Sequence, residues 1–399
     1  MQVLICGGGI AGLTLGLCLH RAGIGCTIVE QAQGPRNAGY MIDFFGSGYD
    51  AAERLGLLPD LERIHYPIAK LSFLNGRGRE KFAVPYVELR KLFDNRHFNF
   101  MRGELEALLL SKMQGAIDIR YGTTVRSFEQ NRAGVDVTLS DGSAMRADLL
   151  VGADGIHSRI RALAFGPEED FIRFLGCNTA AFVLEHPPVD LQGTQAFDTL
   201  TIPGRQVGVY PIRGNRLATF FVHLAPRPPA GDTLAVDELR RGYAKMNWIV
   251  PKLLESAPSD VYIDSVSQIE MPGWSKGRVV LTGDAAWCVS LIAGQGASMA
   301  VAGSYILAEH LSAAPNDLAA ALERYEQRLR PAIAEKQLAG QNMAKWFVPA
   351  DHFHLAIRDT VMRFTGFRKA NRLLKGLFAT SSVFTTPAQP SASGRSRSR

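Results

Sequence analysis

The chain has 399 residues, of which 46% are hydrophobic and 21% are charged. This composition is typical of a globular protein and excludes a disordered or fibrous one, and the length favours two linked domains. No run of about 18 apolar residues predicts a membrane span, and the first residues do not resemble a secretory signal. We therefore expect a cytoplasmic protein without stable membrane insertion.

The formal net charge of +6 comes from the C-terminal end. Residues 358–399 hold nine Lys and Arg residues and one acidic residue, Asp359, so this segment carries +8 and residues 1–357 carry −2. Nucleic-acid binding would require basic residues spread over a folded face, so we expect no nucleic-acid partner. The five cysteines are scattered and never at C-x-x-C spacing, which argues against a disulfide framework and a metal site.

The first thirty residues have the pattern of a βαβ unit. An apolar run, Val3–Cys6, precedes the segment Gly7-Gly8-Gly9-Ile10-Ala11-Gly12, and a helical stretch leads to a second strand that ends at Glu30. Such glycines allow a tight turn and let backbone N–H groups approach a pyrophosphate, and an acid at the strand end accepts ribose hydroxyls. The segment predicts a dinucleotide site but does not separate FAD from NAD.

Two later segments also read as a strand, a glycine-containing turn and a helix. The strand Leu149–Val151 leads into Asp154 and a helix from about Ser158, and the strand Val279–Thr282 leads into Asp284. Each therefore places an aspartate at the carboxyl end of a buried strand, where ligands bind in doubly wound sheets. Further helices are predicted at 102–113, 297–312 and 317–347, and short strands at 117–121, 124–130 and 135–139.

The middle of the chain predicts a second sheet. Alternating, aromatic strands at 206–212 and 217–224 are joined by Gly214-Asn215, which is a hairpin signal. We expect an α/β protein with a discontinuous, Rossmann-like dinucleotide-binding domain of residues 1–66, 95–168 and 273–347. A sheet domain of residues 67–94 and 169–272 is interleaved with it.

The C-terminal part predicts a helix within residues 348–380 and a disordered tail at 385–399. Ile357, Val361 and Phe364 share one helical face, and Arg358 and Arg363 lie elsewhere. We interpret this as a helix that covers the junction of the two domains with a solvated basic side. Binding to a membrane surface is the alternative.

With three motifs in this order, the chain resembles the class A, single-component flavoprotein monooxygenases, the group of p-hydroxybenzoate hydroxylase and the tetracycline-inactivating monooxygenases. The resemblance extends to about residue 345. It implies bound FAD and NAD(P)H as a transient co-substrate. The residues that it assigns to FAD are Gly7, Gly9, Ile10, Ala11, Gly12, Glu30, Gln31, Arg102, Val125, Asp154, Gly283, Asp284, Gly294, Gly296 and Ala297.

The resemblance also implies a role for several of these residues. Arg102 would contact the phosphate or ribityl region, Val125 would reach the adenine through its backbone, and Asp154 would lie beside the pyrophosphate with Arg161 as its companion. Asp284 would bind ribityl hydroxyls. Residues 294–296 would begin a helix whose N–H groups face the pyrimidine edge of the flavin, where the reduced flavin carries negative charge.

Several positions depart from the family pattern. The family usually has His, Pro, Asn and an acid where this chain has, in order, Trp287, Leu291, Ser298 and Gly303, and it often has a basic residue at Gln31. The proline lies near the flavin in the family, so Leu291 puts the detail of the oxygenation site in doubt.

The implied reaction is reduction of FAD by NAD(P)H, addition of molecular oxygen as a flavin C4a-hydroperoxide, and transfer of a hydroxyl to the substrate. The cofactor supplies this chemistry, so we nominate no protein nucleophile. Candidate substrate contacts are Asp43 in the strand 40–45, with an edge-strand gatekeeper as its alternative role, and Tyr210, Phe221 and His223 in the second domain. The apolar and aromatic strands there favour a small hydrophobic aromatic or polyketide-like substrate.

Two other functions remain open at this point. Because Leu291 stands where the family usually has proline, an FAD-dependent reductase or oxidase that inserts no oxygen remains an alternative. A flavin-carrying protein that binds a hydrophobic ligand without turnover is a further alternative. Disulfide reductases are excluded because residues 31–100 contain no cysteine.

Overall fold

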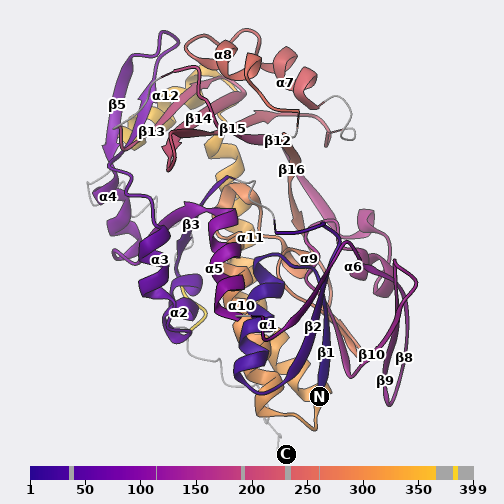
Figure 1. The fold of residues 1–399 in the computed structure, drawn as a ribbon. Coiled ribbons are helices and arrows are strands. Elements are labelled where there is room, and N and C mark those ends of the chain that lie inside the picture. Colours follow the sequence, from indigo (N-terminus) through magenta and orange to yellow (C-terminus); the bar gives the residue numbers. More distant parts are fainter. Residues whose placement is uncertain are drawn as a thin grey trace, which may run out of the picture.

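The computed structural model describes residues 1–35, 40–113, 115–189, 194–229, 235–259, 261–364 and 381–384. Two sheets dominate it, with the long helix α11 running from one to the other (Figure 1). Within the described helices, no segment is both long and apolar enough to cross a membrane. The predicted tail at 385–399 and most of the C-terminal helix beyond Arg363 lie outside the described residues.

The first sheet has six strands in the order β17-β18-β11-β1-β2-β7, and all neighbours are parallel except β17 and β18. Its central strands are buried on both faces, which explains their continuous apolar sequence. The strands are β1 (Gln2–Cys6), β2 (Gly25–Glu30), β7 (Asp118–Tyr121), β11 (Leu149–Gly152), β17 (Ser275–Lys276) and β18 (Val279–Leu281).

Helices pack around this sheet, and α1 lies against both α5 and α10. The flanking helices are α1 (Ile10–Arg21), α2 (Ser47–Arg54), α3 (Leu58–Ile64), α5 (Arg102–Met113), α6 (Arg159–Ala164), α9 (Asp284–Trp287), α10 (Gly296–Ala313) and α11 (Leu318–Phe347). A small sheet of β8 (Val125–Asn131), β9 (Gly134–Leu139) and β10 (Ala144–Ala147) and a ribbon of β3 (Met41–Phe45) and β6 (His97–Met101) complete this part.

The second sheet has seven strands in the order β16-β12-β15-β14-β13-β4-β5. The predicted hairpin is present as the antiparallel pair β14 and β15. The strands are β4 (Lys70–Leu74), β5 (Glu80–Pro85), β12 (Ile172–Leu184), β13 (Ala196–Ile202), β14 (Arg205–Ile212), β15 (Arg216–Leu224) and β16 (Tyr262–Ile269). The short helices near them are α4 (Tyr86–Arg90), η1 (Lys91–Phe93), η2 (Glu168–Asp170), α7 (Ala235–Tyr243) and α8 (Val250–Glu255).

The helix α12 (His352–Arg363) packs against β5, but its orientation differs from the predicted one. Phe353, Ile357 and Phe364 are exposed, whereas the Arg358 side chain is buried with 4% of its surface accessible. The reason is that Arg358 finds hydrogen-bond acceptors inside: its Nη1 donates to Gln206 Oε1 at 3.0 Å and to Thr201 Oγ1 at 3.2 Å. A satisfied guanidinium can be buried, and apolar periodicity alone could not reveal these acceptors.

Two of the residues that depart from the family pattern, Trp287 and Gly303, compensate each other in volume. Trp287 is buried beside Trp274 and Tyr325. A Cβ added at Gly303 would lie only 2.6 Å from Cζ2 of Trp287. The indole therefore occupies the space that a side chain on α10 would need, and the large residue at 287 requires the small one at 303.

We expect Gly303→Ala to destabilise the protein by about 1–3 kcal/mol, because overpacking outweighs the better helix propensity of alanine. The matched control is Gly242→Ala in α7, where a Cβ meets nothing within 4 Å; this change should be neutral or stabilising. Urea denaturation measures both. The double variant Trp287→His/Gly303→Ala should recover part of the lost stability. Equal effects of Gly303→Ala and Gly242→Ala on the free energy of unfolding would contradict the packing argument.

An ion-pair cluster joins the two sheets. His157, in the turn after β11, lies 2.9 Å from Glu168 Oε1 through Nδ1 and 3.5 Å from Asp264 Oδ1, on β16, through Nε2. The hydrogen bond to Asp264 and the one to Glu168 raise the pKa of His157 to about 9. At neutral pH the imidazolium therefore holds β16 to the turn after β11.

A raised folded-state pKa makes this contribution fully present below about pH 6.5, and it is lost as the pH rises through 9. Because the imidazole is 59% exposed, we expect no more than about 1 kcal/mol after solvent screening. Thermal unfolding at pH values below and above this window, with wild type and His157→Asn, measures it. The two proteins should differ more at the lower pH. The control is His20→Asn, at an exposed residue in the last turn of α1. A difference that does not change with pH, or one that His20→Asn reproduces, would contradict the role of His157.

Candidate functional site

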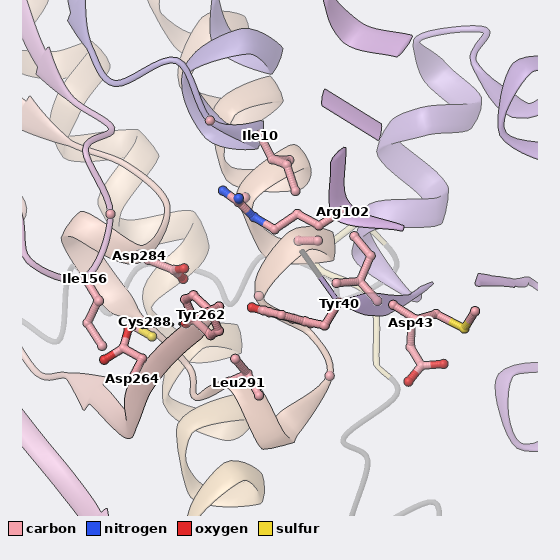
Figure 2. A pocket seen from close by; sticks show the side chains of 18 of the residues that line it. Ile10, Tyr40, Asp43, Arg102, Ile156, Tyr262, Asp264, Asp284, Cys288 and Leu291 are labelled. Atoms are coloured by element: carbon pink, nitrogen blue, oxygen red, sulfur yellow. Dashed lines mark hydrogen bonds between the residues drawn. The ribbon is translucent and has the colours of Figure 1, made fainter. Parts of the chain in front are cut away.

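A cavity of about 530 Å³ lies between the two sheets. One part is lined from the carboxyl ends of the parallel strands, by residues that follow β1, β2, β11 and β18, which is where doubly wound sheets bind ligands. The other part is lined by the seven-stranded sheet, α11 and α12. Figure 2 shows Ile10, Arg102 and Asp284 around the first part, with Asp43 and Leu291 further along.

The glycine turn after β1 is tightly packed against the turn after β11. Gly7 has a φ of +112°, and a Cβ there would lie 2.3 Å from the Ala153 carbonyl oxygen; a Cβ at Gly12 would lie 1.9 Å from the Gly7 carbonyl oxygen. Gly7 and Gly9 line the cavity, whereas Gly12 does not. Gly12 therefore serves the turn itself, and side chains are excluded where a pyrophosphate must approach the backbone.

Glu30 lies at the end of β2, as the motif requires. Its Oε2 accepts a hydrogen bond from the Gly8 N–H at 2.7 Å, and its Oε1 accepts one from the Ala32 N–H at 2.8 Å. These bonds hold the carboxylate at the cavity wall, beside Gln31. The position suits recognition of ribose hydroxyls.

Asp154 stabilises its own turn and also faces the cavity. Its carboxylate accepts hydrogen bonds from the Ser158 hydroxyl at 2.5 Å and the Ile160 N–H at 3.1 Å, and the residue also lines the cavity. Burial raises the pKa of Asp154, and these two donors oppose the shift.

The predicted companion, Arg161, is fully buried, and its guanidinium donates to groups other than Asp154. It instead donates to the carbonyl oxygens of Ile156 at 2.6 Å and Ala285 at 3.1 Å. It thereby ties the turn after β11 to α9.

Asp284 and Arg102 form the charged centre of the first part of the cavity. Burial raises the pKa of the Asp284 carboxyl, and the nearby Arg102 guanidinium opposes this shift. Arg102 also pairs with Glu106 at 2.8 Å, one turn along α5. An arginine and a carboxylate facing one cavity can bind a phosphate and sugar hydroxyls respectively.

The helix α10 begins at the cavity, as predicted. Gly294, Gly296 and Ala297 all line it, and the 18-residue length of α10 gives its N-terminus a positive electrostatic end. Gly283 has a φ of +63° and packs against Ala11 rather than lining the cavity. Val125 does not line it either, although the preceding Thr124 does; the Val125 carbonyl oxygen accepts a hydrogen bond from Arg159 Nε at 2.6 Å.

Of the candidate substrate contacts in the second sheet, the structure brings the one on β14 to the cavity and not the two on β15. Tyr210 and Gln206, on one face of β14, line the cavity. On β15 it is Phe220 that faces the cavity, whereas Phe221 is fully buried on the opposite face and His223 contacts Tyr243 there. The reason is that α7 and α8 cover this opposite face with apolar side chains, which strand alternation alone could not reveal.

Asp43 lines the cavity, and three side chains converge on its Oδ1. Asn99 Nδ2 lies at 2.6 Å, His97 Nε2 at 3.0 Å and the Tyr86 hydroxyl at 3.2 Å. Sequence reasoning found Asp43 but missed these partners. The signal for His97 and Asn99 was their alternation on β6, which pairs with β3 in the register Asp43 to Asn99.

Arg358 is a second cavity residue that sequence reasoning missed. Its guanidinium lies over the Phe73 ring, 5.4 Å from the centroid. Its position in a helix with alternating apolar and basic residues predicted a solvated side chain. Only the packing of α12 against the second sheet brings it to the cavity.

The residues around the first part of the cavity fit FAD. The tight glycine turn leaves the backbone open to a pyrophosphate, Glu30 faces the region of a ribose, and Arg102 and Asp284 offer complementary partners to phosphate and hydroxyl groups. The start of α10 offers N–H groups to the electron-rich edge of a flavin.

Comparison with known proteins agrees with this geometry. The family model described as FAD binding domain matches residues 1–339. The chain is 34% identical to the protein Rv1260 of Mycobacterium tuberculosis (strain ATCC 25618 / H37Rv), over 84% of this chain and 91% of that protein. It is 28% identical to a flavin-dependent monooxygenase of an unknown prokaryotic organism, over 87% and 90% of the two chains.

Among solved structures, the tetracycline destructase Tet(55) superposes with a TM-score of 0.80 at 26% identity, covering 95% of this chain and 96% of that one. The family match, the relatives and the fold are therefore consistent with the three motifs. The chain belongs to the FAD-binding domain family, and it is an FAD-dependent oxidoreductase of the class A flavoprotein monooxygenases.

Proposed function

We propose that the protein uses FAD, NAD(P)H and molecular oxygen to hydroxylate a hydrophobic aromatic or polyketide-like substrate. The observation that carries this proposal is that one cavity continues from the FAD-binding turn into an apolar chamber. The apolar residues that line this chamber are Leu71, Phe73, Leu89, Phe93, Phe197, Phe220, Ile292, Met343, Trp346, Phe347 and Met362. The likeness to a tetracycline destructase supports a polycyclic substrate.

In this proposal, FAD would be held by the residues of the first part of the cavity, and when bound it supplies the redox and oxygen-transfer chemistry. The glycine turn, Glu30, Asp154, Arg102 and Asp284 bind and orient it. The N-terminus of α10 stabilises negative charge on the reduced ring system.

The apolar chamber positions the substrate and excludes water. Tyr210 contributes to this shape because its hydroxyl accepts a hydrogen bond from the Met41 N–H and its ring stacks on Phe197 at 5.0 Å. Tyr210 thus joins the second sheet to β3. It lines the cavity as a fixed wall and orients the substrate.

A reductase or oxidase on the same scaffold is the second candidate, because Leu291 lines the cavity where the family usually has proline. Leu291 begins the short helix η3 (Leu291–Ala293), after Ser290, whose φ is +97°. An oxygen-labelling experiment separates the two functions.

We expect FAD-loaded protein to consume NADPH or NADH faster when a phenolic or polyketide ligand such as tetracycline is present. Under ¹⁸O₂, the product should contain one labelled oxygen atom per reduced nicotinamide consumed, because the second oxygen atom leaves as water. Mass spectrometry of the product and nicotinamide absorbance measure the two quantities.

The control is a variant that lacks the cofactor, Gly12→Val, in which a side chain collides with the Gly7 carbonyl oxygen; it should show neither signal. Substrate-dependent nicotinamide consumption that continues without oxygen and gives an unlabelled product would instead establish the reductase. Peroxide as the sole oxygen product with both phenolic and polyketide ligands would contradict hydroxylation of this substrate class.

A further inference from the structure

We propose that Asp43 is the substrate-recognition carboxylate of the chamber, and that its Oδ2 accepts a hydrogen bond from a phenolic or enolic hydroxyl of the substrate. This inference rests on the proposed function and narrows its substrate class. The expected ligand is an aromatic or enol compound with a free hydroxyl group.

The hydrogen bonds of Asp43 leave one carboxylate oxygen directed at the cavity. Three donors from β6 and α4, namely Asn99, His97 and Tyr86, all lie on Oδ1. Within the described part of the chain, all three of these hydrogen bonds go to Oδ1 and none goes to Oδ2. This oxygen lies 3.7 Å from where a Cβ on Gly294 would be, at the cavity wall. An ionised carboxylate has acceptor sites on both oxygens, so Oδ2 is available to a ligand.

The donors themselves form a rigid, buried group. His97 has no accessible side-chain surface, and its ring stacks on Phe93 with centroids 4.9 Å apart. Asn99 is 2% exposed. Burial and the adjacent Asp43 carboxylate raise the pKa of Tyr86 well above its usual value, so its hydroxyl stays protonated and donates.

The buried donors distinguish a recognition group from an edge-strand gatekeeper. A gatekeeper charge on β3 would face solvent and require no buried partners. Asp43 faces the cavity instead, with 46% of its side-chain surface accessible, and its partners His97 and Asn99 are polar side chains that are costly to bury. Three residues from two elements are therefore committed to fixing the direction of one carboxylate.

The chemistry of the surrounding chamber favours a hydroxyl as the donor. Many of the walls are aromatic and aliphatic, and a charged group among them, Arg358, directs its N–H groups to Gln206, Thr201 and Asp359. A phenol or enol that donates to a carboxylate gains electron density in its ring or double bond. The added electron density activates the substrate toward an electrophilic oxygen donor. The same hydrogen bond also binds and orients the substrate.

The test measures binding of two neutral probes, 2-naphthol and its methyl ether, to FAD-loaded protein without nicotinamide, through changes in flavin absorbance. The ether carries a methyl group in place of the hydroxyl hydrogen, so it has no hydrogen-bond donor. We expect wild type to bind the naphthol at least about 10-fold more tightly, because a hydrogen bond to a charged group contributes that much.

The decisive variant is Asp43→Asn. The three donors will keep the amide oxygen at the position of Oδ1, so the amide NH₂ replaces the acceptor Oδ2. The preference for the naphthol should fall by about 10-fold or more while binding of the ether stays the same. Asp136→Asn, which removes an exposed carboxylate paired with Arg146 on β10, is the matched control and should change neither value.

His97 is a positioning residue, and its variants test the geometry. His97→Phe should reduce the preference because one donor to Oδ1 is lost, and His97→Gln should restore part of it. If His97 had only a structural role, His97→Phe would weaken the binding of both probes equally.

Three results would overturn the proposal: equal losses for both probes in Asp43→Asn, a preference that this variant leaves unchanged, and the absence of binding of either probe to wild type. If Asp43→Asn changes FAD affinity or the flavin spectrum but not the preference, Asp43 is a flavin ligand instead. Failure of the proposed function is separate, because oxygen incorporation is measured with nicotinamide present and binding is measured without it.

Discussion

The close contact between the turns after β1 and β11 is the constraint on which the site depends. The Ala153 N–H donates to the Cys6 carbonyl oxygen at 2.7 Å, and Gly7 leaves no room for a side chain against Ala153. Because both strands are parallel, this contact brings the glycine turn and Asp154 to one edge of the sheet. The buried Arg161 extends the same edge to α9 through the Ala285 carbonyl oxygen. Three segments that are far apart in the sequence thereby face one cavity.

The second sheet acts as a wall with two different faces. The face toward the cavity presents Gln206, Tyr210 and Phe220, and the opposite face is buried under α7 and α8. The Tyr210 hydroxyl and the His157 ion pairs connect this wall to the FAD-binding part. These few polar contacts lie between otherwise apolar surfaces. They therefore couple the shape of the chamber to the position of the FAD-binding part.

The departures from the family pattern have physical explanations at some positions. Trp287 and Gly303 form a compensating pair in the core. Ser298, where an asparagine is frequent, accepts a hydrogen bond from the Phe45 N–H at 3.2 Å and lies against Gly48. These changes conserve packing around α10, so the start of this helix can keep its place at the cavity. Nothing in the structure explains why leucine replaces proline at Leu291.

The sequence by itself determined the local units of the nucleotide site. The glycine turn, Glu30, Asp154 and Asp284 follow from short motifs in which strand, turn and helix are adjacent along the chain. Their chemistry depends on backbone geometry within a few residues, which is why the sequence was sufficient to predict them and the α/β fold.

Only the tertiary structure decided which side chains form the chamber. Strand alternation divides Phe220 from Phe221, but the helices that cover one face decide which of them reaches the cavity. Helical periodicity placed Arg358 in solvent, yet acceptors on β13 and β14 bury it. The donors on Asp43 come from segments more than 40 residues away. Each of these assignments depends on long-range packing, which a local pattern such as the alternation of His97 and Asn99 does not specify by itself.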